Sequence, residues 1–373
     1  MSFVVSSQYL NKRCGLHLKE YQKPNPTNPN KLGIINGNGQ FTSCSCHEHI
    51  TREKYNEVIP KIIDELYAAG LHGTLEHFQK DIDMGREYED LKKDNVNINS
   101  ITAQKTTKSN RLIKSRQYNL SDVKDHNGTN IEMNWTKDKL KTAFMQLDKP
   151  NYTVNASISE LLKKFKFSPV TVYSPLMTKR ILEELECRTV FDPCIGWGGR
   201  MVGTTCIGSS HYTGCEPCVK TYQGLERIKN DLGLNSQVNI INKPVEEALD
   251  NELKDMMFDC CITSPPYYDL EIYSDEDTQS IKKFPTYELW LDKFIDPIIK
   301  YVSEHVTKYS CWSVKNFKTD QQYNLLDDVI RIHDKYGWKK VKEYGLKKNV
   351  KDGSKYGDMT YVFINGGHNT NQT

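Results

Sequence analysis

From about residue 165 onward, short apolar runs alternate with amphipathic stretches, and this rhythm restricts the fold more than any other feature of the chain. Parallel neighbouring strands need a crossover connection, and a helix usually supplies it. The predicted fold class is therefore α/β, with a doubly wound, mainly parallel sheet. The expected strands are RTVFD (188–192), HYTGCE (211–216), QVNIIN (237–242), FDCCIT (258–263), YSCWSV (309–314) and YVFIN (361–365).

The chain before residue 165 has a different character. It is polar and irregular, and the stretch at 23–40 is rich in Pro, Asn and Gly, which predicts a loop or linker. One helix is expected at 52–70, where Tyr55, Val58, Ile62, Ile63 and Leu66 recur at helical spacing before Gly70. We therefore expect a smaller, mostly helical or irregular N-terminal region at 1–164 and an α/β domain at 165–373.

Composition excludes several classes of protein. The 373 residues are 37% hydrophobic and 26% charged, as in a globular chain, and no apolar run reaches the roughly 20 residues of a membrane helix. The start lacks the apolar core of a signal peptide, and the 11 cysteines fall largely inside apolar strand-like runs. We expect no membrane association and a cytoplasmic, or comparably reducing, location.

A glycine-rich turn follows the first predicted strand. In "FDPCIGWGGR", Asp192 and Pro193 end the strand, Gly196 and Gly198 lie in a tight loop, and a helix begins near Arg200. Nucleotide, dinucleotide and S-adenosylmethionine sites all use such a turn, and many similar turns are purely structural. No GKS or GKT follows the glycines, which disfavours a phosphate-binding loop.

An acidic residue ends the second predicted strand. Glu216 lies roughly 24 residues after Asp192, the spacing at which a carboxylate accepts hydrogen bonds from ribose hydroxyls. The glycine turn and this acid together indicate a nucleoside-containing ligand, and a dinucleotide remains an alternative.

The fourth predicted strand ends in Ser264-Pro265-Pro266-Tyr267. A pair of prolines can simply end a strand, but ligands of a doubly wound sheet bind at the carboxyl ends of its strands. An exocyclic amine of adenine or cytosine is a poor nucleophile because its lone pair is conjugated into the ring. The Ser264 side chain and the backbone carbonyl beside Pro265 would accept hydrogen bonds from the amine and localise that pair. Tyr267 would offer a flat face to a base that has left its stack.

These segments resemble the S-adenosylmethionine-dependent amino-methyltransferases of DNA, which make N4-methylcytosine or N6-methyladenine. "DPCIGWGGR" resembles their glycine motif, "TSPPYYDL" their catalytic tetrapeptide, and "VYSPLMTKRILEEL" (172–185) the segment that helps to hold the methionine end of the cofactor. The resemblance covers roughly residues 165–373 and implies a Rossmann-like methyltransferase sheet, S-adenosylmethionine as cofactor and base flipping. The implied cofactor-binding residues are Tyr173, Ser174, Pro175, Asp192, Pro193, Gly196, Gly198, Glu216 and Asn242, and the implied catalytic residues are Ser264, Pro265, Pro266 and Tyr267.

A serine at the first position of the tetrapeptide is more usual among the N4-cytosine enzymes of this family, so cytosine is favoured over adenine. The chain also departs from the family pattern. Cys194 stands where Phe is frequent, Gly199-Arg200 replaces a small polar pair, and Asn242-Lys243 follows the third strand where an acid often contacts adenine. An amide at Asn242 can still bond the adenine amine.

The N-terminal region is expected to recognise or clamp nucleic acid. A basic stretch at 102–120 carries Lys105, Lys108, Arg111, Lys114 and Arg116 with no acid among them, which fits phosphate contacts or a solvated helix face equally. "SCSCHEH" places Cys44, Cys46, His47 and His49 close together, but the spacing differs from common zinc fingers, so we expect no metal. Cys215 and Cys218 are interpreted as packing residues.

The expected function is therefore methyl transfer to the exocyclic amine of a flipped DNA base. The alternatives are an amino-methyltransferase acting on RNA or a free base, a protein amide as substrate, and a non-catalytic nucleic-acid-binding protein that keeps the fold. A paired restriction nuclease would fit the family, although nothing in the sequence indicates one.

Overall fold

The computed structural model describes residues 60–71 except 62, 82–101, 110–145 except 131, 172–347 and 356–366, together with short strands before residue 51. The chain divides into two compact units. The first combines Met1–Lys80 with Thr129–Pro169, and the second combines Asp81–Gly128 with Val170–Thr373.

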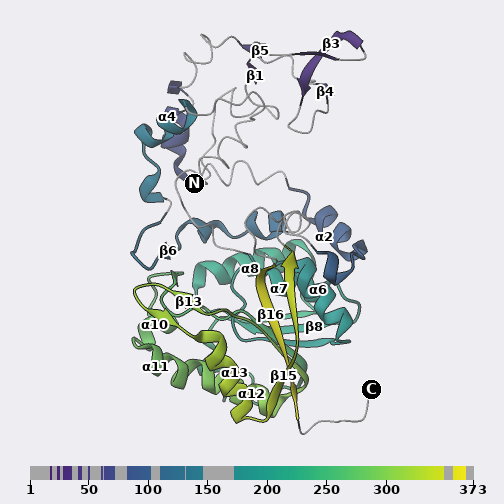
Figure 1. Cartoon of the computed structure of the whole chain (residues 1–373), viewed down its shortest axis with the longest axis vertical. Coiled ribbons are helices and arrows are strands. Elements are labelled where there is room, and N and C mark those ends of the chain that lie inside the picture. Colours follow the sequence, from purple (N-terminus) through teal and green to yellow (C-terminus); the bar gives the residue numbers. More distant parts are fainter. Residues whose placement is uncertain are drawn as a thin grey trace. The chain divides into compact units, whose positions relative to one another are not determined.

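The second unit is built on a seven-stranded sheet with the order β15-β16-β12-β10-β7-β8-β9 (Figure 1). Its strands are β7 (Thr189–Asp192), β8 (His211–Cys215), β9 (Val238–Ile241), β10 (Phe258–Thr263), β12 (Val306–Ser313), β15 (Trp338–Lys347) and β16 (Tyr356–Asn365). The five strands from β9 to β12 run parallel to their neighbours, and β16 lies antiparallel between β12 and β15. The predicted doubly wound, mainly parallel Rossmann-like sheet is confirmed.

The order of the strands places the switch point of the sheet between β7 and β10. The chain moves outward from β7 to β8 and β9, then returns to the other side of β7 as β10. Ligands of such sheets bind beyond the carboxyl ends of the strands at this point. The residues that follow Asp192 and Thr263 are therefore in the position where a ligand would bind.

Helices cover both faces of the sheet, because its strands carry apolar side chains on both sides. Figure 1 shows α6 (Pro175–Glu184), α7 (Gly199–Thr205) and α8 (Val219–Asp231) on one face, and α12 (Asp296–His305) and α13 (Leu325–Lys335) on the other. Side chains alternate accordingly along β10. Cys260 and Ile262 join one hydrophobic core, and the intervening Cys261 joins the other.

Two features of the sheet unit were not expected from the sequence. β15 contains many lysines, and among its residues with described side chains only Trp338 and Tyr344 are buried, so its apolar pattern is weak. It lies at the edge of the sheet, where charged residues discourage pairing with other chains. The helical segment 287–305 contains a π-helical turn at Leu291–Ile295, just before Pro297, which lacks a backbone N–H.

The segment 81–128 belongs to the sheet unit, although the boundary expected at 164/165 placed it in the N-terminal region. Helix α2 (Met84–Lys93) buries Met84, Tyr88 and Leu91 in the same core as α6 and α7. The Tyr88 hydroxyl donates to the carbonyl of Thr205 at 2.8 Å. The remaining positions of α2 are mostly charged, so its single apolar stripe gave little signal in the sequence.

Lys179 on α6 joins this segment to the sheet unit a second time. Its ammonium group is buried and donates to the carbonyls of Leu91, Lys92 and Asp94 at 3.1, 2.6 and 2.7 Å. These carbonyls lie at the end of α2, where helix carbonyls lack intrahelical donors. A lysine there donates to three carbonyls at once, and its positive charge interacts favourably with the negative end of the helix dipole.

The first unit contains more strand structure than expected. The stretch at 23–40 was predicted as a loop, and this was wrong for most of it. The structure shows β2 (Lys23–Asn25) and β3 (Asn28–Ile35), which form an antiparallel sheet with β4 (Phe41–Ser43). Because β2 is an edge strand, Pro24 can be accommodated there.

The predicted helix at 52–70 is confirmed over the residues that the structure describes, which begin at 60. Ile63 and Leu66 are buried, and Gly70 has a φ of +67°, as expected of a residue that closes a helix. The Trp135 indole donates to the carbonyl of Leu66 at 3.1 Å. Tyr55, Val58 and Ile62 lie outside the described residues.

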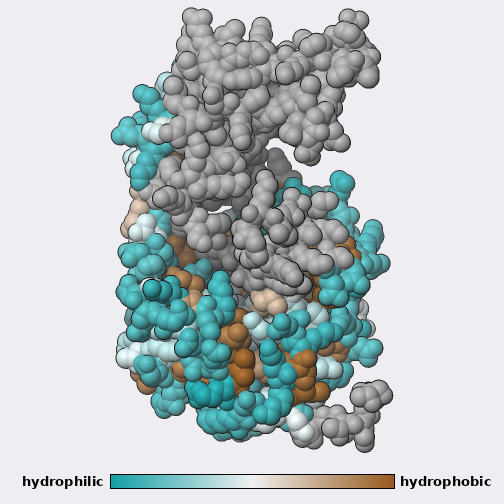
Figure 2. Space-filling model, in the orientation of Figure 1, coloured by the Kyte–Doolittle hydropathy of each residue, from teal (hydrophilic) through white to brown (hydrophobic). Residues whose placement is uncertain are grey.

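Few large apolar side chains are exposed among the residues that the structure describes. On the face drawn in Figure 2, the described residues are mostly hydrophilic, and the hydrophobic patches between them are small and separate. No helix among the described residues is long and apolar enough to cross a bilayer.

Candidate active site

The loop between β7 and α7 is the floor of the candidate site. Gly198 has a φ of +94°, a conformation that favours glycine. At Gly199 a Cβ atom would lie 1.9 Å from the carbonyl oxygen of Tyr173, so no other residue fits without a shift of the backbone. The glycines of the predicted motif thus allow the turn and its close approach to the segment before α6.

A buried ion pair holds this loop in shape. Asp192 is fully buried, and its Oδ2 accepts from Arg200 Nε at 2.7 Å and from the Tyr212 hydroxyl at 2.6 Å. Arg200 also donates to the carbonyls of Cys194 and Ile195. Burial favours the neutral form of Arg200, but the charge of Asp192 outweighs this effect and the pKa of Arg200 is raised. The guanidinium is therefore committed to the loop.

Glu216 follows β8 and lies beside the same loop. Its Oε2 accepts from the backbone N–H of Gly196 at 3.0 Å and its Oε1 from that of Cys218 at 2.9 Å. Burial raises the pKa of Glu216 from 4.5 to about 8, although both backbone bonds lower it. Each carboxylate oxygen keeps a further lone pair for a ligand hydroxyl.

Asn242 supports Glu216 from β9. Its amide donates to the carbonyl of Glu216 at 2.8 Å. The Asn242 side chain contacts the backbone after β8 and does not line the cavity that is described below. A direct bond from Asn242 to adenine stays a prediction.

The tetrapeptide begins directly after β10 and turns its tyrosine toward β12. The Tyr267 hydroxyl donates to the carbonyl of Ser313 at 3.3 Å. The Tyr267 ring is stacked on Phe317, with ring centroids 5.8 Å apart and planes inclined by 19°. Lys315 places its ammonium group 5.7 Å from the centroid of the Tyr267 ring. The aromatic face is thus fixed by a hydrogen bond at one end and a stacked ring behind it.

Tyr268, the next residue, points elsewhere. Its φ is +45°, and its hydroxyl donates to the carbonyl of Pro285 at 2.7 Å. Its ring packs with those of Tyr287, Trp290 and Tyr323. This unusual backbone conformation separates the two neighbouring tyrosines, so only Tyr267 faces the site.

The segment before α6 closes a further side. Ser174 caps α6 by accepting from the N–H of Met177 at 3.3 Å, and Pro175 occupies the first turn. The Tyr173 hydroxyl is hydrogen-bonded to Thr360 Oγ1 of β16 at 2.7 Å. Arg200 lies over the Tyr173 ring at 5.3 Å. The tyrosine therefore connects the glycine loop with β16.

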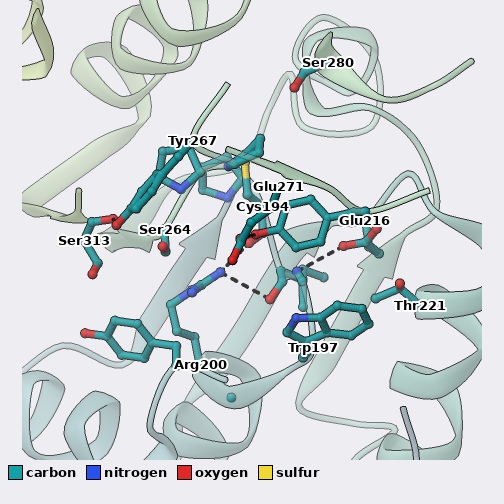
Figure 3. A pocket seen from close by; sticks show the side chains of 18 of the residues that line it. Cys194, Trp197, Arg200, Glu216, Thr221, Ser264, Tyr267, Glu271, Ser280 and Ser313 are labelled. Atoms are coloured by element: carbon teal, nitrogen blue, oxygen red, sulfur yellow. Dashed lines mark hydrogen bonds between the residues drawn. The ribbon is translucent and has the colours of Figure 1, made fainter. Parts of the chain in front are cut away.

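These parts surround one cavity of about 470 Å³ at the switch point of the sheet (Figure 3). This volume is in the range of ligand pockets. All four predicted catalytic residues line the cavity: Ser264, Pro265, Pro266 and Tyr267. Among the predicted cofactor-binding residues, Tyr173, Ser174, Pro193, Gly196 and Glu216 line it, whereas Pro175, Asp192, Gly198 and Asn242 do not. Asp192 and Gly198 shape the loop, and Pro175 begins α6.

Several lining residues were missed in the sequence. Trp197 lies in the glycine loop, and Glu271 and Tyr273 follow the tetrapeptide by a few positions. Their proximity to the two motifs was the available signal. Asn110 comes from the segment 81–128, which was expected to belong to another region, and its buried Oδ1 has no hydrogen-bond partner among the described residues.

The same segment is tied to the glycine loop. The Gln117 amide donates to the carbonyls of Trp197 at 3.2 Å and Thr221 at 3.4 Å. Asn119 donates to Thr221 Oγ1 at 2.9 Å. Residues before position 165 thus support the cavity directly.

The basic residues of 102–120 are only partly described. Lys105 and Lys108 lie outside the described residues. Arg111 is 2.5 Å from Glu87 and Arg116 is 2.5 Å from Asp231, while Lys114 is partly buried and burial lowers its pKa. Their contacts with phosphates stay a prediction. To make these contacts, the two arginines would have to leave Glu87 and Asp231 and pair with phosphate groups instead.

The cysteine and histidine clusters give no metal site among the described residues, where no group of three or more potential ligands is placed to hold an ion. Cys44, Cys46 and His47 lie outside them, and His49 belongs to β5 (His49–Ile50). Cys215 and Cys218 are buried, which confirms that they are packing residues.

No family model matches the sequence, and no curated protein matches it. Solved structures with a similar arrangement include TrmN from Thermus thermophilus, with 11% identity over 53% of this chain and 51% of that one and a TM-score of 0.36. The matched region thus spans about half the length of TrmN.

Two further structures are similar to the same extent. A SAM-dependent methyltransferase from Agrobacterium tumefaciens has 11% identity over 53% of this chain and 63% of its own, with a TM-score of 0.37. Magnesium protoporphyrin IX methyltransferase from Synechocystis, solved with bound SAM, has 10% identity over 60% and 90%, with a TM-score of 0.35. At this level of similarity the function has to be argued from the site itself.

Proposed function

We propose that this protein transfers a methyl group from S-adenosylmethionine to the exocyclic amine of a nucleobase, with DNA as substrate and cytosine N4 favoured over adenine N6. One observation carries the proposal. The tetrapeptide Ser264–Tyr267 and the acid Glu216 follow two different strands and line one cavity at the switch point of the sheet.

The cavity fits S-adenosylmethionine on its own chemistry. Glu216 is buried with only two backbone donors, and its raised pKa indicates a carboxylate that would gain from further donors such as the two ribose hydroxyls. The buried Asn110 Oδ1 has no partner in the part of the chain that the structure describes, and it can accept from a ligand N–H or hydroxyl. Gly199 brings the backbone of Tyr173 close to the loop, where the methionine end would be held.

When bound, the cofactor supplies an electrophilic methyl group: a new N–C bond forms from the amine lone pair, the C–S bond breaks with its electron pair kept by sulfur, and one amine proton leaves to solvent. Ser264 Oγ and the carbonyl beside Pro265 would accept hydrogen bonds from the two N–H groups of the amine and localise the nitrogen lone pair. Since the attacking nitrogen becomes acidic as it gains positive charge, no strong base is needed.

Tyr267 would hold the base. Its ring cannot rotate freely, because the Ser313 carbonyl fixes the hydroxyl and Phe317 supports one face. Because the Tyr267 ring is already fixed, its side chain loses little further conformational entropy when a base stacks on it. A flipped base, or a base of a single strand, could reach this face.

DNA is preferred here over RNA because of the resemblance of the tetrapeptide and glycine motif to the DNA enzymes. RNA is the second candidate, since an amine presented by an unpaired RNA base would suit the same acceptors. A non-catalytic scaffold is less well supported, because the glycine loop, Glu216 and the tetrapeptide all meet at one cavity.

The experiment that tests the proposal is transfer from labelled S-adenosylmethionine to duplex DNA, single-stranded DNA and RNA, followed by digestion and identification of the modified nucleoside. N4-methylcytosine from DNA is the expected product, and N6-methyladenine would support the class with the other base. A product only from RNA would favour the second candidate.

Ser264→Ala is the matched variant for this experiment. It should lower turnover by about a hundredfold and leave the cofactor Kd within about threefold, because an acceptor to the amine acts on the transferring nitrogen. Equal losses of turnover and cofactor affinity would contradict the assigned role of Ser264.

A further inference from the structure

Glu271 is an acidic residue of the cavity that neither the tetrapeptide nor the glycine motif includes. It begins the short strand β11 (Glu271–Ile272), which pairs with β6 (Lys124–Asp125). Its side chain is half-buried and lines the cavity. Figure 3 shows it above the glycine loop, between Tyr267 and Glu216.

A tyrosine holds this carboxylate in place. The Tyr273 hydroxyl donates a hydrogen bond to Glu271 Oε2, and the Tyr273 ring lies 6.1 Å from that of Trp197 in the glycine loop. Burial, and then the negative charge of Glu271, raise the pKa of Tyr273 well above its ordinary value. Tyr273 therefore remains a neutral donor, and Glu271 is oriented as an acceptor.

Two cationic side chains that line the cavity, Arg200 and Lys315, contact groups other than Glu271. Arg200 is paired with Asp192 at 2.7 Å and bonds two loop carbonyls. Lys315 lies beside the Tyr267 ring. Within the described part of the chain, no basic side chain forms an ion pair with Glu271.

A carboxylate in this situation selects the charge of its ligand. A ligand that fills the cavity removes water from Glu271, and a desolvated charge is costly unless it meets an opposite charge. A cationic group is therefore favoured in the part of the ligand that faces Glu271. An uncharged group there would be bound more weakly, because the carboxylate would lose its water and keep the hydrogen bond from Tyr273 without gaining an opposite charge.

The position of Glu271 indicates which cation this is. Glu216 would bind the ribose, and Ser264 and Tyr267 would bind the amine and its base. The atom that carries the methyl group has to lie between the ribose and the amine. Glu271 lines the same cavity, and the view in Figure 3 draws it between Glu216 and Tyr267.

We propose that Glu271, oriented by Tyr273, is the counter-ion of the cofactor's sulfonium group and makes the site prefer S-adenosylmethionine over its demethylated product. This inference rests on the proposed function. Loss of the methyl group converts the sulfonium into a neutral thioether, and Glu271 then faces an uncharged sulfur. The spent cofactor is thereby released more readily than the charged one.

The test compares the Kd of S-adenosylmethionine with that of S-adenosylhomocysteine by titration calorimetry at one pH and ionic strength. The two compounds share the adenine, the ribose, the ammonium and the carboxylate and differ in the methyl group on sulfur and the positive charge that it brings. Glu271→Gln should weaken binding of S-adenosylmethionine by about tenfold or more and change that of S-adenosylhomocysteine by less than about twofold. Glu288→Gln, an exposed acid of α11 (Tyr287–Trp290), is the matched control and should change neither Kd.

Two further variants keep the test independent of folding defects in Glu271→Gln. Glu271→Asp retains the charge and should retain most of the preference. Tyr273→Phe removes only the orienting hydrogen bond and should reduce the preference in the same direction by a smaller factor.

The proposal would be overturned if Glu271→Gln weakened both compounds by the same factor, since the carboxylate would then serve a group that they share. Unchanged affinity for both compounds would also overturn it. If the unmodified protein bound neither compound, the proposed function itself would fail, which is a different result from bound cofactor without discrimination.

Discussion

The backbone N–H of Gly196 donates to Glu216 Oε2 at 3.0 Å, so the loop after β7 and the acid after β8 are joined by a direct hydrogen bond. The bond positions the carboxylate at the cavity, but burial still raises the pKa of Glu216 to about 8. Protonation of this side chain therefore controls how well it can accept hydrogen bonds near neutral pH.

Cofactor binding should strengthen as pH rises toward 8. Ribose hydroxyls donate best to the ionised carboxylate, so each pH unit below the pKa of Glu216 should weaken binding by up to about tenfold. The Kd of S-adenosylmethionine measured from pH 6.5 to 8.5 checks this. Glu216→Gln is the control, because it keeps the titration of the ligand and removes that of Glu216; an unaltered pH slope in this variant would contradict the assignment.

The same pKa predicts the effect on stability of the ligand-free protein. The folded state holds the proton of Glu216 more tightly than the unfolded state, where the pKa is near 4.5. The contribution of Glu216 to the free energy of unfolding is therefore largest below about pH 4.5 and is lost as pH rises through about 8.

Tyr267→Ala should lower turnover far more than Tyr267→Phe. Alanine removes the aromatic face that stacks on Phe317, whereas phenylalanine keeps it and loses only the hydroxyl contact with the Ser313 carbonyl. We expect losses of about a hundredfold for alanine and less than about fivefold for phenylalanine, since base–aromatic stacking contributes about 1–3 kcal/mol. Steady-state kinetics with the nucleic-acid substrate measure both, and similar losses would indicate a role for the hydroxyl instead.

Gly199→Ala should destabilise the protein strongly. The added Cβ would lie 1.9 Å from the Tyr173 carbonyl oxygen, which is backbone and cannot move aside cheaply. We expect a loss of about 3 kcal/mol or more in the free energy of unfolding, measured by denaturant titration. Gly208→Ala is the matched control, since its Cβ would meet nothing within 4 Å and its φ is not in the left-handed region. A neutral Gly199→Ala would mean that the loop is looser than its contacts indicate.

Lys179→Met should release the segment 81–128 from the sheet unit. Methionine keeps much of the apolar stem but leaves the carbonyls of Leu91, Lys92 and Asp94 without their donor, at a cost of about 3 kcal/mol. Limited proteolysis should then cut within this segment sooner than in the unmodified protein. Lys300→Met, which removes an exposed lysine of α12, should leave the cutting pattern unchanged. Equal protection in both variants would contradict the anchoring role of Lys179.

The sequence by itself determined the sheet and the two motifs. Short apolar runs with helical crossovers allow few folds, and strands of a doubly wound sheet bring their carboxyl ends to one edge. Gly196, Glu216 and Ser264 could therefore be assigned to one site before their distances were known. Their residue types were enough to suggest their chemical roles, because the ability to form a tight turn, to accept a hydrogen bond or to stack on a base belongs to the individual residue.

Only the tertiary structure decided which side chains outside those motifs also line the cavity. Glu271 lines it because β11 pairs with β6, and Asn110 lines it because α2 and the residues around Gln117 pack on the sheet unit. It also decided that Asp192 is bound to Arg200 and does not line the cavity, which its place after β7 could not show. Pairings between segments far apart in the chain depend on the packing of the whole core, and local sequence patterns do not contain that information.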